Sequence, residues 1–329
     1  MALPLEQPRA RVSIDGVPVP GLVELEIDAG GCFLAGRFLA AFALGAVPGF
    51  DVAYYAGLTS QNVLIEVAPD GLGYTALLIG QVDAVRIDWT SNLASIAGRD
   101  LTALLIDAEI SQSFVNQTAS QIAERIAGEH GLIPNVVQTT ALVGQYYQLD
   151  HARTALGLNA HVTTEWELLT TLAQAEGFLV SVTGNTLNFG PTPVAAPVFI
   201  TPGRLSSLSF DMITTLPGAV TVKSWNCRNK SVVTETQGAG LMATIIRPNQ
   251  AQAQAQALAQ GHLQTLGQHR LIMQARMPAD TVLVPGMQLL LAGVGGALDQ
   301  TYVVDAVTRR LDGRAGFVQD VRAHAAVVM

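Results

Sequence analysis

The alternation of apolar and polar residues predicts β-structure in the first third of the chain. Residues 22–28 place Val23, Leu25 and Ile27 on one face of a strand and two glutamates on the other. This period of two is that of a half-buried strand. Turns rich in Pro, Gly or Asp separate further strand-like runs at residues 11–15, 32–44, 62–67, 74–89 and 93–97. Short strands at this spacing are typical of a β-sandwich or a small barrel.

The middle third changes to a helical period and predicts a small mixed α/β unit. Residues 117–130 repeat apolar side chains at helical spacing and stop at a glycine. A second helix begins at Thr164, with Glu167 three residues on, and ends at Gly177. This spacing is a capping box, in which each side chain binds the other residue's free backbone N–H. A Gly-Asn dipeptide at residues 184–185 then separates two β runs, as a hairpin turn would.

The last third returns to β-structure after a proline-dense boundary near residue 200. Its strand-like runs are residues 205–210, 219–225, 242–246, 271–276, 288–291, 302–307 and 316–322. A helix rich in alanine and glutamine interrupts them at residues 251–266, with Asn249 as its predicted N-cap. The run Val-Asp-Ala-Val occurs at residues 82–85 and again at residues 304–307, near the end of a β region in each case. This echo indicates two related β domains.

Charged residues are scarce, since Asp, Glu, Lys and Arg make up 13% of the chain, against roughly 25% in soluble domains. A membrane or a large protein interface should therefore hide much of the surface. The best transmembrane candidate, residues 28–51, contains Arg37 and several glycines, and a charge at a bilayer centre is costly. We expect no stable membrane insertion and an interface instead. The N-terminus lacks the pattern of a secretory signal, so synthesis in a cytoplasm is expected.

Candidate chemistry is sparse in this sequence. Six histidines lack the spacing of metal ligands, and two cysteines suggest neither a zinc cluster nor a disulfide framework. No phosphate-binding loop or nucleophile elbow occurs. The net charge is −8 and no run of Lys and Arg exceeds the pair Arg309–Arg310, which disfavours a nucleic-acid-binding protein. We expect no catalytic residues, no cofactor, no metal and no sequence-specific nucleic-acid binding.

Four stretches of the chain resemble the baseplate hub proteins of phage tails, of the late-control-protein-D type. They are AGRDLTALL at residues 97–105, TASQIAERIA at 118–127, EWELL to EGF at 165–178, and the motifs PAD, VPGM and YVVDAV within residues 278–307. Their order and spacing extend over nearly the whole chain. The resemblance implies a mainly β fold of the α+β class. Two tube-like β-barrel domains, at residues 1–100 and 201–329, would flank an α/β insert at residues 101–200.

The resemblance also implies a function and partners. A hub of this type is a homotrimeric ring whose six barrels mimic the sixfold tail tube. It adapts that tube to a threefold central spike and lines the DNA channel. The expected partners are the tail tube or distal tail protein, the central spike protein and the tape measure protein. The expected location is the virion tail, at the baseplate, of a particle made in the cytoplasm of a bacterial host, and no catalytic residue belongs to this role.

We expect the apolar run at residues 32–44 to pack between protomers, with Phe33, Leu39, Phe42 and Leu44 at the interface, because an open strand edge invites pairing. An aspartate at Leu39 or Phe42 should then break the assembly while the monomer is still expressed. Two alternatives stay open, an all-β enzyme that acts on glycans through two carboxylates and a cell-wall-binding module with exposed aromatic residues. The sequence does not choose between contractile, non-contractile and gene-transfer-like particles.

Overall fold

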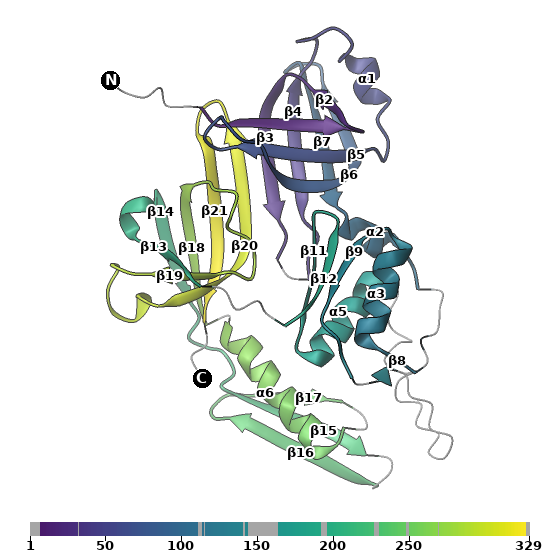
Figure 1. Cartoon of the computed structure of the whole chain (residues 1–329). Coiled ribbons are helices and arrows are strands. Elements are labelled where there is room, and N and C mark those ends of the chain that lie inside the picture. The colour runs from purple at the N-terminus through teal and green to yellow at the C-terminus, as the bar shows by residue number, and fades with distance from the viewer. Residues whose placement is uncertain are drawn as a thin grey trace.

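The computed structural model describes residues 7–31, 33–110, 114, 116–140, 142–143, 164–191, 196–226, 230–247, 250–268 and 270–326 of the chain. Two β halves lie side by side, and two helix-containing inserts lie below them in the view of Figure 1. The mainly β, α+β class that the sequence predicts is confirmed. Among the described residues, no helix is long and apolar enough to cross a membrane.

One sheet runs through both β halves. It has 13 strands, and its main path follows the order β14-β18-β21-β20-β3-β4-β7-β6-β5-β1-β2, with β13 and β19 beside this path. The strands from the first third are β1 (Arg9–Ile14), β2 (Val17–Val19), β3 (Leu22–Ala29), β4 (Arg37–Ala43), β5 (Asn62–Ala68), β6 (Thr75–Asp88) and β7 (Leu93–Asp100). Those from the last third are β13 (Val198–Ile200), β14 (Ser207–Met212), β18 (Leu271–Pro278), β19 (Gln288–Leu291), β20 (Thr301–Asp312) and β21 (Gly316–Ala325). Short 3₁₀ helices lie at Pro202–Arg204 and Gly296–Leu298.

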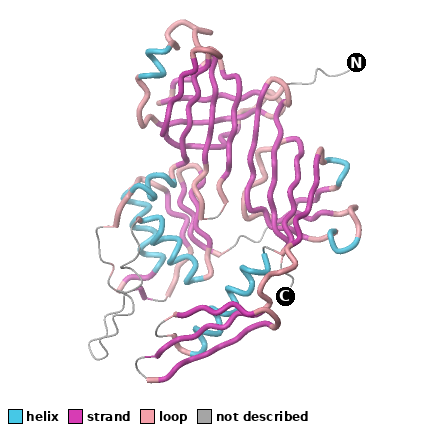
Figure 2. Tube along the Cα trace, turned by 180° about the vertical axis from the view of Figure 1, so that it is seen from behind, coloured by secondary structure: helices cyan, strands magenta, loops and turns pink. Residues whose placement is uncertain are grey.

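The two β halves join through β20 and β3, which are antiparallel neighbours. The first part of β20 pairs with β19, and its last residues, 307–312, pair with residues 24–29 of β3. Figure 2 shows the strands of the two halves lying next to one another at this junction. The structure differs here from the expected pair of separate barrels. One long strand extends from the second half into the first, and no sheet of the described chain closes into a barrel.

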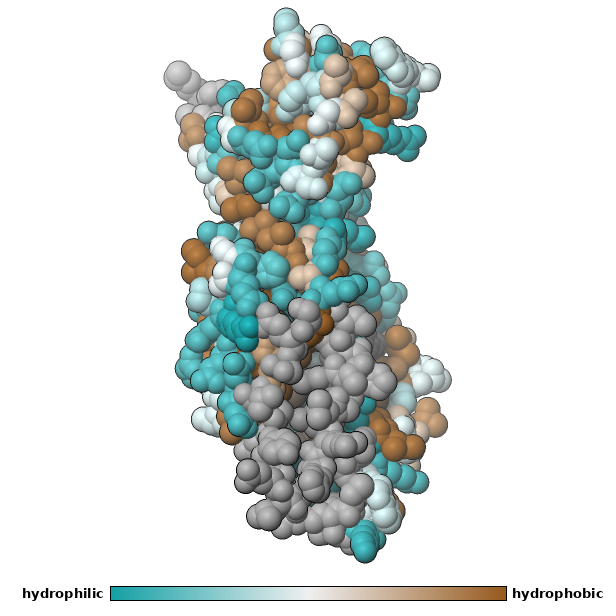
Figure 3. Space-filling view, turned by 90° about the vertical axis from the view of Figure 1, so that its right-hand side faces the viewer, coloured by the Kyte–Doolittle hydropathy of each residue, from teal (hydrophilic) through white to brown (hydrophobic). Residues whose placement is uncertain are grey.

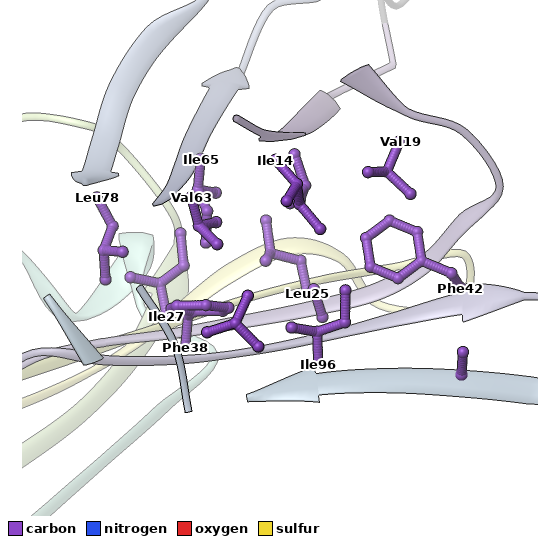
Figure 4. Close-up of a cluster of buried hydrophobic side chains, with 14 of the residues drawn as sticks. Ile14, Val19, Leu25, Ile27, Phe38, Phe42, Val63, Ile65, Leu78 and Ile96 are labelled. Atoms are coloured by element: carbon purple, nitrogen blue, oxygen red, sulfur yellow. The ribbon is translucent and has the colours of Figure 1, made fainter. Parts of the chain in front are cut away.

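Each half buries its own apolar core. In the first half, β1 and β5 cross over β3 and β4 (Figure 1), and α1 (Val52–Ala56) contributes Tyr55 to the same core. The side chains that fill this space come from both layers and include Ile14, Leu25, Phe42, Val63 and Ile96 (Figure 4). The core of the second half includes Met273, Leu289, Tyr302, Val307 and Val321. The shared sheet therefore carries two separate packing units.

The first insert is the α/β unit that the sequence predicts between the two halves. Its elements are α2 (Thr102–Asp107), β8 (Gln117–Thr118), α3 (Ala119–Glu129), β9 (Ile133–Val136), β10 (Leu142–Val143), α5 (Glu165–Glu176), β11 (Leu179–Thr183) and β12 (Thr186–Gly190). Thr164 caps α5, as predicted, by accepting a hydrogen bond from the Glu167 backbone N–H. Gly177 ends this helix with a φ of 69°, and Gly184 turns the β11–β12 hairpin with a φ of 59°. The predicted helix end and the predicted hairpin turn are both confirmed.

A second insert interrupts the last third, where the sequence predicts one β domain with a single helix. It contains β15 (Ala219–Asn226), β16 (Ser231–Gly238), β17 (Met242–Ile246) and α6 (Gln252–Gln268). The strands form a sheet of their own, in the order β16-β15-β17, and α6 packs on one face of it through Ala255 and Ala259. The predicted N-cap, Asn249, lies outside the described residues. Residues 219–268 are therefore a packing unit separate from the second β half.

Candidate assembly surface

The echoed Val-Asp-Ala-Val runs occupy the same structural place in the two β halves. In each run the aspartate is the extra residue of a β-bulge. The register shifts between Val82 and Ala84 of β6, opposite β7, and between Val304 and Ala306 of β20, opposite β21. A bulge bends its strand and increases the local twist. Both long strands therefore change direction at the echoed run.

Each bulged aspartate binds a basic side chain on the next strand. Asp83 Oδ2 lies 2.7 Å from Arg99 Nε, and Asp305 Oδ1 lies 2.5 Å from His324 Nδ1. Arg99 also binds Asp107 at 2.9 Å, and the two carboxylates raise the pKa of its guanidinium above the usual value. The echo thus extends from the backbone to the side chains around it.

The strand order extends this equivalence to most of each half. The order β3-β4-β7-β6-β5 in the first half matches β14-β18-β21-β20-β19 in the second. The strand registers agree as well, because Leu25 and Ile27 of β3 and Leu208 and Phe210 of β14 all face their own cores. One chain therefore contains two copies of the same five-stranded unit.

The face of the sheet that points away from the two cores is crossed by ion pairs. Arg310 Nε lies 2.7 Å from Glu26 across the β20–β3 junction, and its Nη1 lies 2.8 Å from Asp320. Asp320 also binds Arg276 at 2.7 Å, and this arginine holds the pKa of the Asp320 carboxyl below its usual range. Half-exposed pairs of this kind contribute about 1 kcal/mol or less each. Their main consequence is that both arginines are neutralised by carboxylates on the polar face.

Two strand edges of the repeated unit have no partner in the described part of the chain. The part of β20 after its bulge pairs with β3, whereas the matching part of β6, residues 84–88, is paired on its β7 side only. β14, the counterpart of β3, is likewise paired on its β18 side only. An unpaired edge offers a row of N–H and C=O groups to another strand. The internal junction joins two kinds of edge, namely the part of a long strand after its bulge and a β3-like strand. The described chain presents one further edge of each kind, residues 84–88 of β6 and β14, and both are open.

A hollow of about 460 Å³ borders the open part of β6. It is lined by residues 82–85 and Ile87 of β6, and by Tyr55, Ala56 and residues 58–60 from α1 and the segment after it. Tyr55 is fully buried, and its hydroxyl has no hydrogen-bond partner within the described chain. Burial raises the pKa of this hydroxyl to about 12. The hollow and the open edge form one continuous surface.

The structure separates the four residues that the sequence predicts for an interface. Phe42 and Leu44 lie in the core of the first half, and Phe42 is 0% exposed. Phe33 packs against the core of the first insert, where its carbonyl accepts a hydrogen bond from Trp166 Nε1 at 3.3 Å. Leu39 is 44% exposed and lies on the polar face of the sheet. Of the four, Leu39 has the most surface to offer a partner, and the predicted interface role stays a prediction.

The described residues include no group of three or more His, Cys, Asp and Glu side chains that could hold a metal ion. Two of the three tryptophans are exposed, namely Trp89 just after β6 and Trp225 on β15. On the face shown in Figure 3, hydrophobic residues gather over the first β half, at the top, among hydrophilic ones. The features that stand out are thus strand edges and apolar surface. The open edge that the sequence predicts within residues 32–44 is wrong, because β4 pairs with β3 on one side and with β7 on the other. Sequence reasoning missed the edges of β6 and β14, since pairing between distant strands leaves no local signal.

The sequence matches no protein-family profile and no curated protein, whereas several solved structures share its architecture. The tail protein from Neisseria meningitidis MC58 covers 97% of this chain and aligns over 96% of its own length, with a TM-score of 0.75 and 14% identity. The chain has a tail-protein fold. This fold has the predicted class and agrees with the resemblance to phage tail hub proteins.

The tail-protein fold recurs in further structures. The 43 kDa tail protein of prophage MuSo2 from Shewanella oneidensis has a TM-score of 0.75 and 15% identity, over 97% of this chain and 98% of that one. A component of the type VI secretion system from E. coli has a TM-score of 0.61 and 13% identity, over 96% of this chain and 76% of that one. At these identities the likeness establishes the fold.

Proposed function

We propose that this chain is the structural baseplate hub of a phage tail or a tail-like particle. Three copies form a ring that adapts the sixfold tail tube to a threefold central spike. The observation that carries the proposal is the internal repeat, because one chain supplies two copies of a five-stranded unit and three chains supply six. The tail-protein fold supports the same role, and no enzymatic activity is part of it.

The ring closes, in this proposal, through the two open edges. The internal junction between β20 and β3 joins the two units of one chain. The same kind of junction, between the open part of β6 in one copy and β14 of the next, would join one chain to another. Such a contact uses different surfaces on the two partners, so it generates a closed ring when its rotation is a simple fraction of a turn. Added strands contribute backbone hydrogen bonds to the contact.

We assign the polar face of the sheet to the DNA channel. Arg310 and Arg99 on this face are each bound by two carboxylates. Affinity for DNA depends on Lys and Arg side chains that neutralise phosphates. On a chain with a net charge of −8, carboxylates that bind these two arginines would weaken their hold on DNA that passes. The tape measure protein, the tail tube or distal tail protein and the spike would contact the two ends of the ring.

The oligomeric state of the purified full-length chain tests this function. Native mass spectrometry, or size-exclusion chromatography with light scattering, should show a species of three times the chain mass. Electron microscopy of the particle should place that ring between the tail tube and the spike. A chain that stays monomeric at every concentration and binds cell-wall sacculi would contradict the hub and favour the wall-binding alternative.

A further inference from the structure

The position of the hollow beside β6 has an equivalent at the internal junction, where β3 occupies it. At the internal junction, Val307 at the end of the echoed run lies opposite Ala29 of β3, and Val307 is fully buried in the core of the second half. Val85 ends the other echoed run and holds the same place in β6, but it borders the hollow. The hollow therefore marks the position where a strand equivalent to β3 is missing.

β14 is the strand that matches β3, and its register shows which residue would reach the hollow. In each half, three residues that lie directly opposite one another on neighbouring strands form a row. Each row ends at the basic residue that binds the bulged aspartate of that half, so the two rows can be aligned. These two rows are Asp28–Arg37–Arg99 and Asp211–Ile272–His324. Ala29 follows the aspartate of the first row and Met212 follows that of the second, so they occupy equivalent positions. A second copy of β14 would thus place Met212 opposite Val85.

Met212 differs from the other residues on its side of β14. Leu208 and Phe210 lie on the same face and pack against the core of the second half, whereas Met212 is 64% exposed. Its counterpart Ala29 is small and lies directly opposite the buried Val307 at the internal junction. A flexible thioether side chain fills irregular gaps and makes favourable contacts with aromatic rings. The long residue and the hollow thus occur at matching positions of the two open edges.

We propose that Met212 of a second copy of this chain inserts into the hollow, beside Tyr55 and Val85, when β14 pairs with the open part of β6. This inference rests on the proposed ring. The same register places Asp211 opposite Arg86, and both residues are exposed. Opposite charges directly across a strand pair stabilise the pairing. The hollow, the exposed methionine and the charge pair all select the same partner and the same register.

A comparison of two exposed methionines in the full-length chain tests the contact. Met212→Asp should raise the dissociation constant of the oligomer about tenfold or more, because the contact loses a buried methionine side chain. Met242→Asp changes a residue that is 57% exposed on β17, away from the hollow, and should leave the constant unchanged. Analytical ultracentrifugation measures both variants, and far-UV circular dichroism verifies that they fold. Equal effects of the two substitutions, or none from Met212→Asp, would overturn the proposal.

A disulfide trap tests the register directly. In the Val85→Cys, Met212→Cys double variant, cysteines of neighbouring copies should cross-link under oxidation, since opposed residues of antiparallel strands have Cβ atoms about 4.5–5.5 Å apart. The Val85→Cys, Met242→Cys variant is the matched control and should give no such covalent oligomer. An oligomer that lacks this cross-link and tolerates Met212→Asp overturns the contact and leaves the ring. A wild-type chain that never oligomerises overturns both.

Discussion

Phe42 and Leu39 lie three residues apart on β4, and their truncation should have very different consequences for stability. Phe42 is 0% exposed and its ring centroid lies 5.9 Å from that of Tyr55 (Figure 4 shows Phe42 among its apolar neighbours). Removal of a buried phenyl group leaves a cavity and costs about 3–5 kcal/mol. Leu39 is 44% exposed, so Leu39→Ala removes side-chain surface that is already partly in water, and should cost about 1 kcal/mol or less.

Urea denaturation followed by circular dichroism measures the difference between Phe42→Ala and Leu39→Ala. With a slope of about 3 kcal/mol per molar urea, a loss of about 4 kcal/mol lowers the midpoint of the first β half by more than about 1 M. Leu39→Ala should lower it by less than about 0.4 M on the same slope. Equal shifts for the two variants would refute the assignment of Phe42 to the core and Leu39 to the surface.

The same pair separates folding from assembly. Leu39→Asp should leave a folded chain, and a loss of the oligomer in this variant would support the predicted interface role of Leu39. Phe42→Asp should unfold the first β half, because it buries a carboxylate in an apolar core without a partner. The expectation that an aspartate at Phe42 spares the monomer therefore needs revision. A folded, soluble Phe42→Asp monomer would contradict the structure.

Two further predictions concern close packing and pH. A Cβ added to Gly31 would lie 2.5 Å from the carbonyl oxygen of Asp305, so Gly31→Ala should destabilise the internal junction by about 1–3 kcal/mol. Gly128→Ala, on α3 with open space around it, should stabilise the chain by up to about 1 kcal/mol, and thermal unfolding compares the two. Arg276 lowers the pKa of Asp320 from 3.8, so this carboxylate stabilises the fold fully above about pH 5 and progressively less as the pH falls through its folded pKa. Asp320→Asn should flatten the acid limb of the unfolding free energy, and an unchanged limb would speak against the pair.

The sequence predicts local elements well where a periodic apolar face meets a clear start or stop. The run at residues 242–246 coincides with β17, and the run at residues 288–291 coincides with β19. β16 has no such signal, because Ser231–Gly238 is rich in Ser, Thr and Glu and lies at the edge of its sheet. The apolar run at residues 32–44 yields a strand only from Arg37 onward, since Phe33 has a positive φ of 73° before it.

The sequence predicts that an assembly surface exists, but it does not locate that surface on the chain. Alternation along β4 shows that Phe42 and Leu39 face opposite sides, but it does not say which side is the core of the same chain. The β20–β3 junction joins residues that lie more than 270 positions apart, and no local pattern encodes such a pairing. The Val-Asp-Ala-Val echo was the one sequence signal of the repeat, and its meaning depended on finding a bulge in each copy.

The structure shows which parts of the surface are apolar in this charge-poor chain. Trp89, which is 74% exposed, directly follows the open part of β6, and Met212 ends the open strand β14. On the second insert, Trp225 and Ile246 are exposed on strands whose other face packs against α6. Apolar residues thus gather at edges and faces that lack a partner within the described part of the chain, while several charged side chains form ion pairs on the polar face. This distribution fits the proposed ring, in which the open edges would pair with a neighbouring copy and the polar face would let DNA pass.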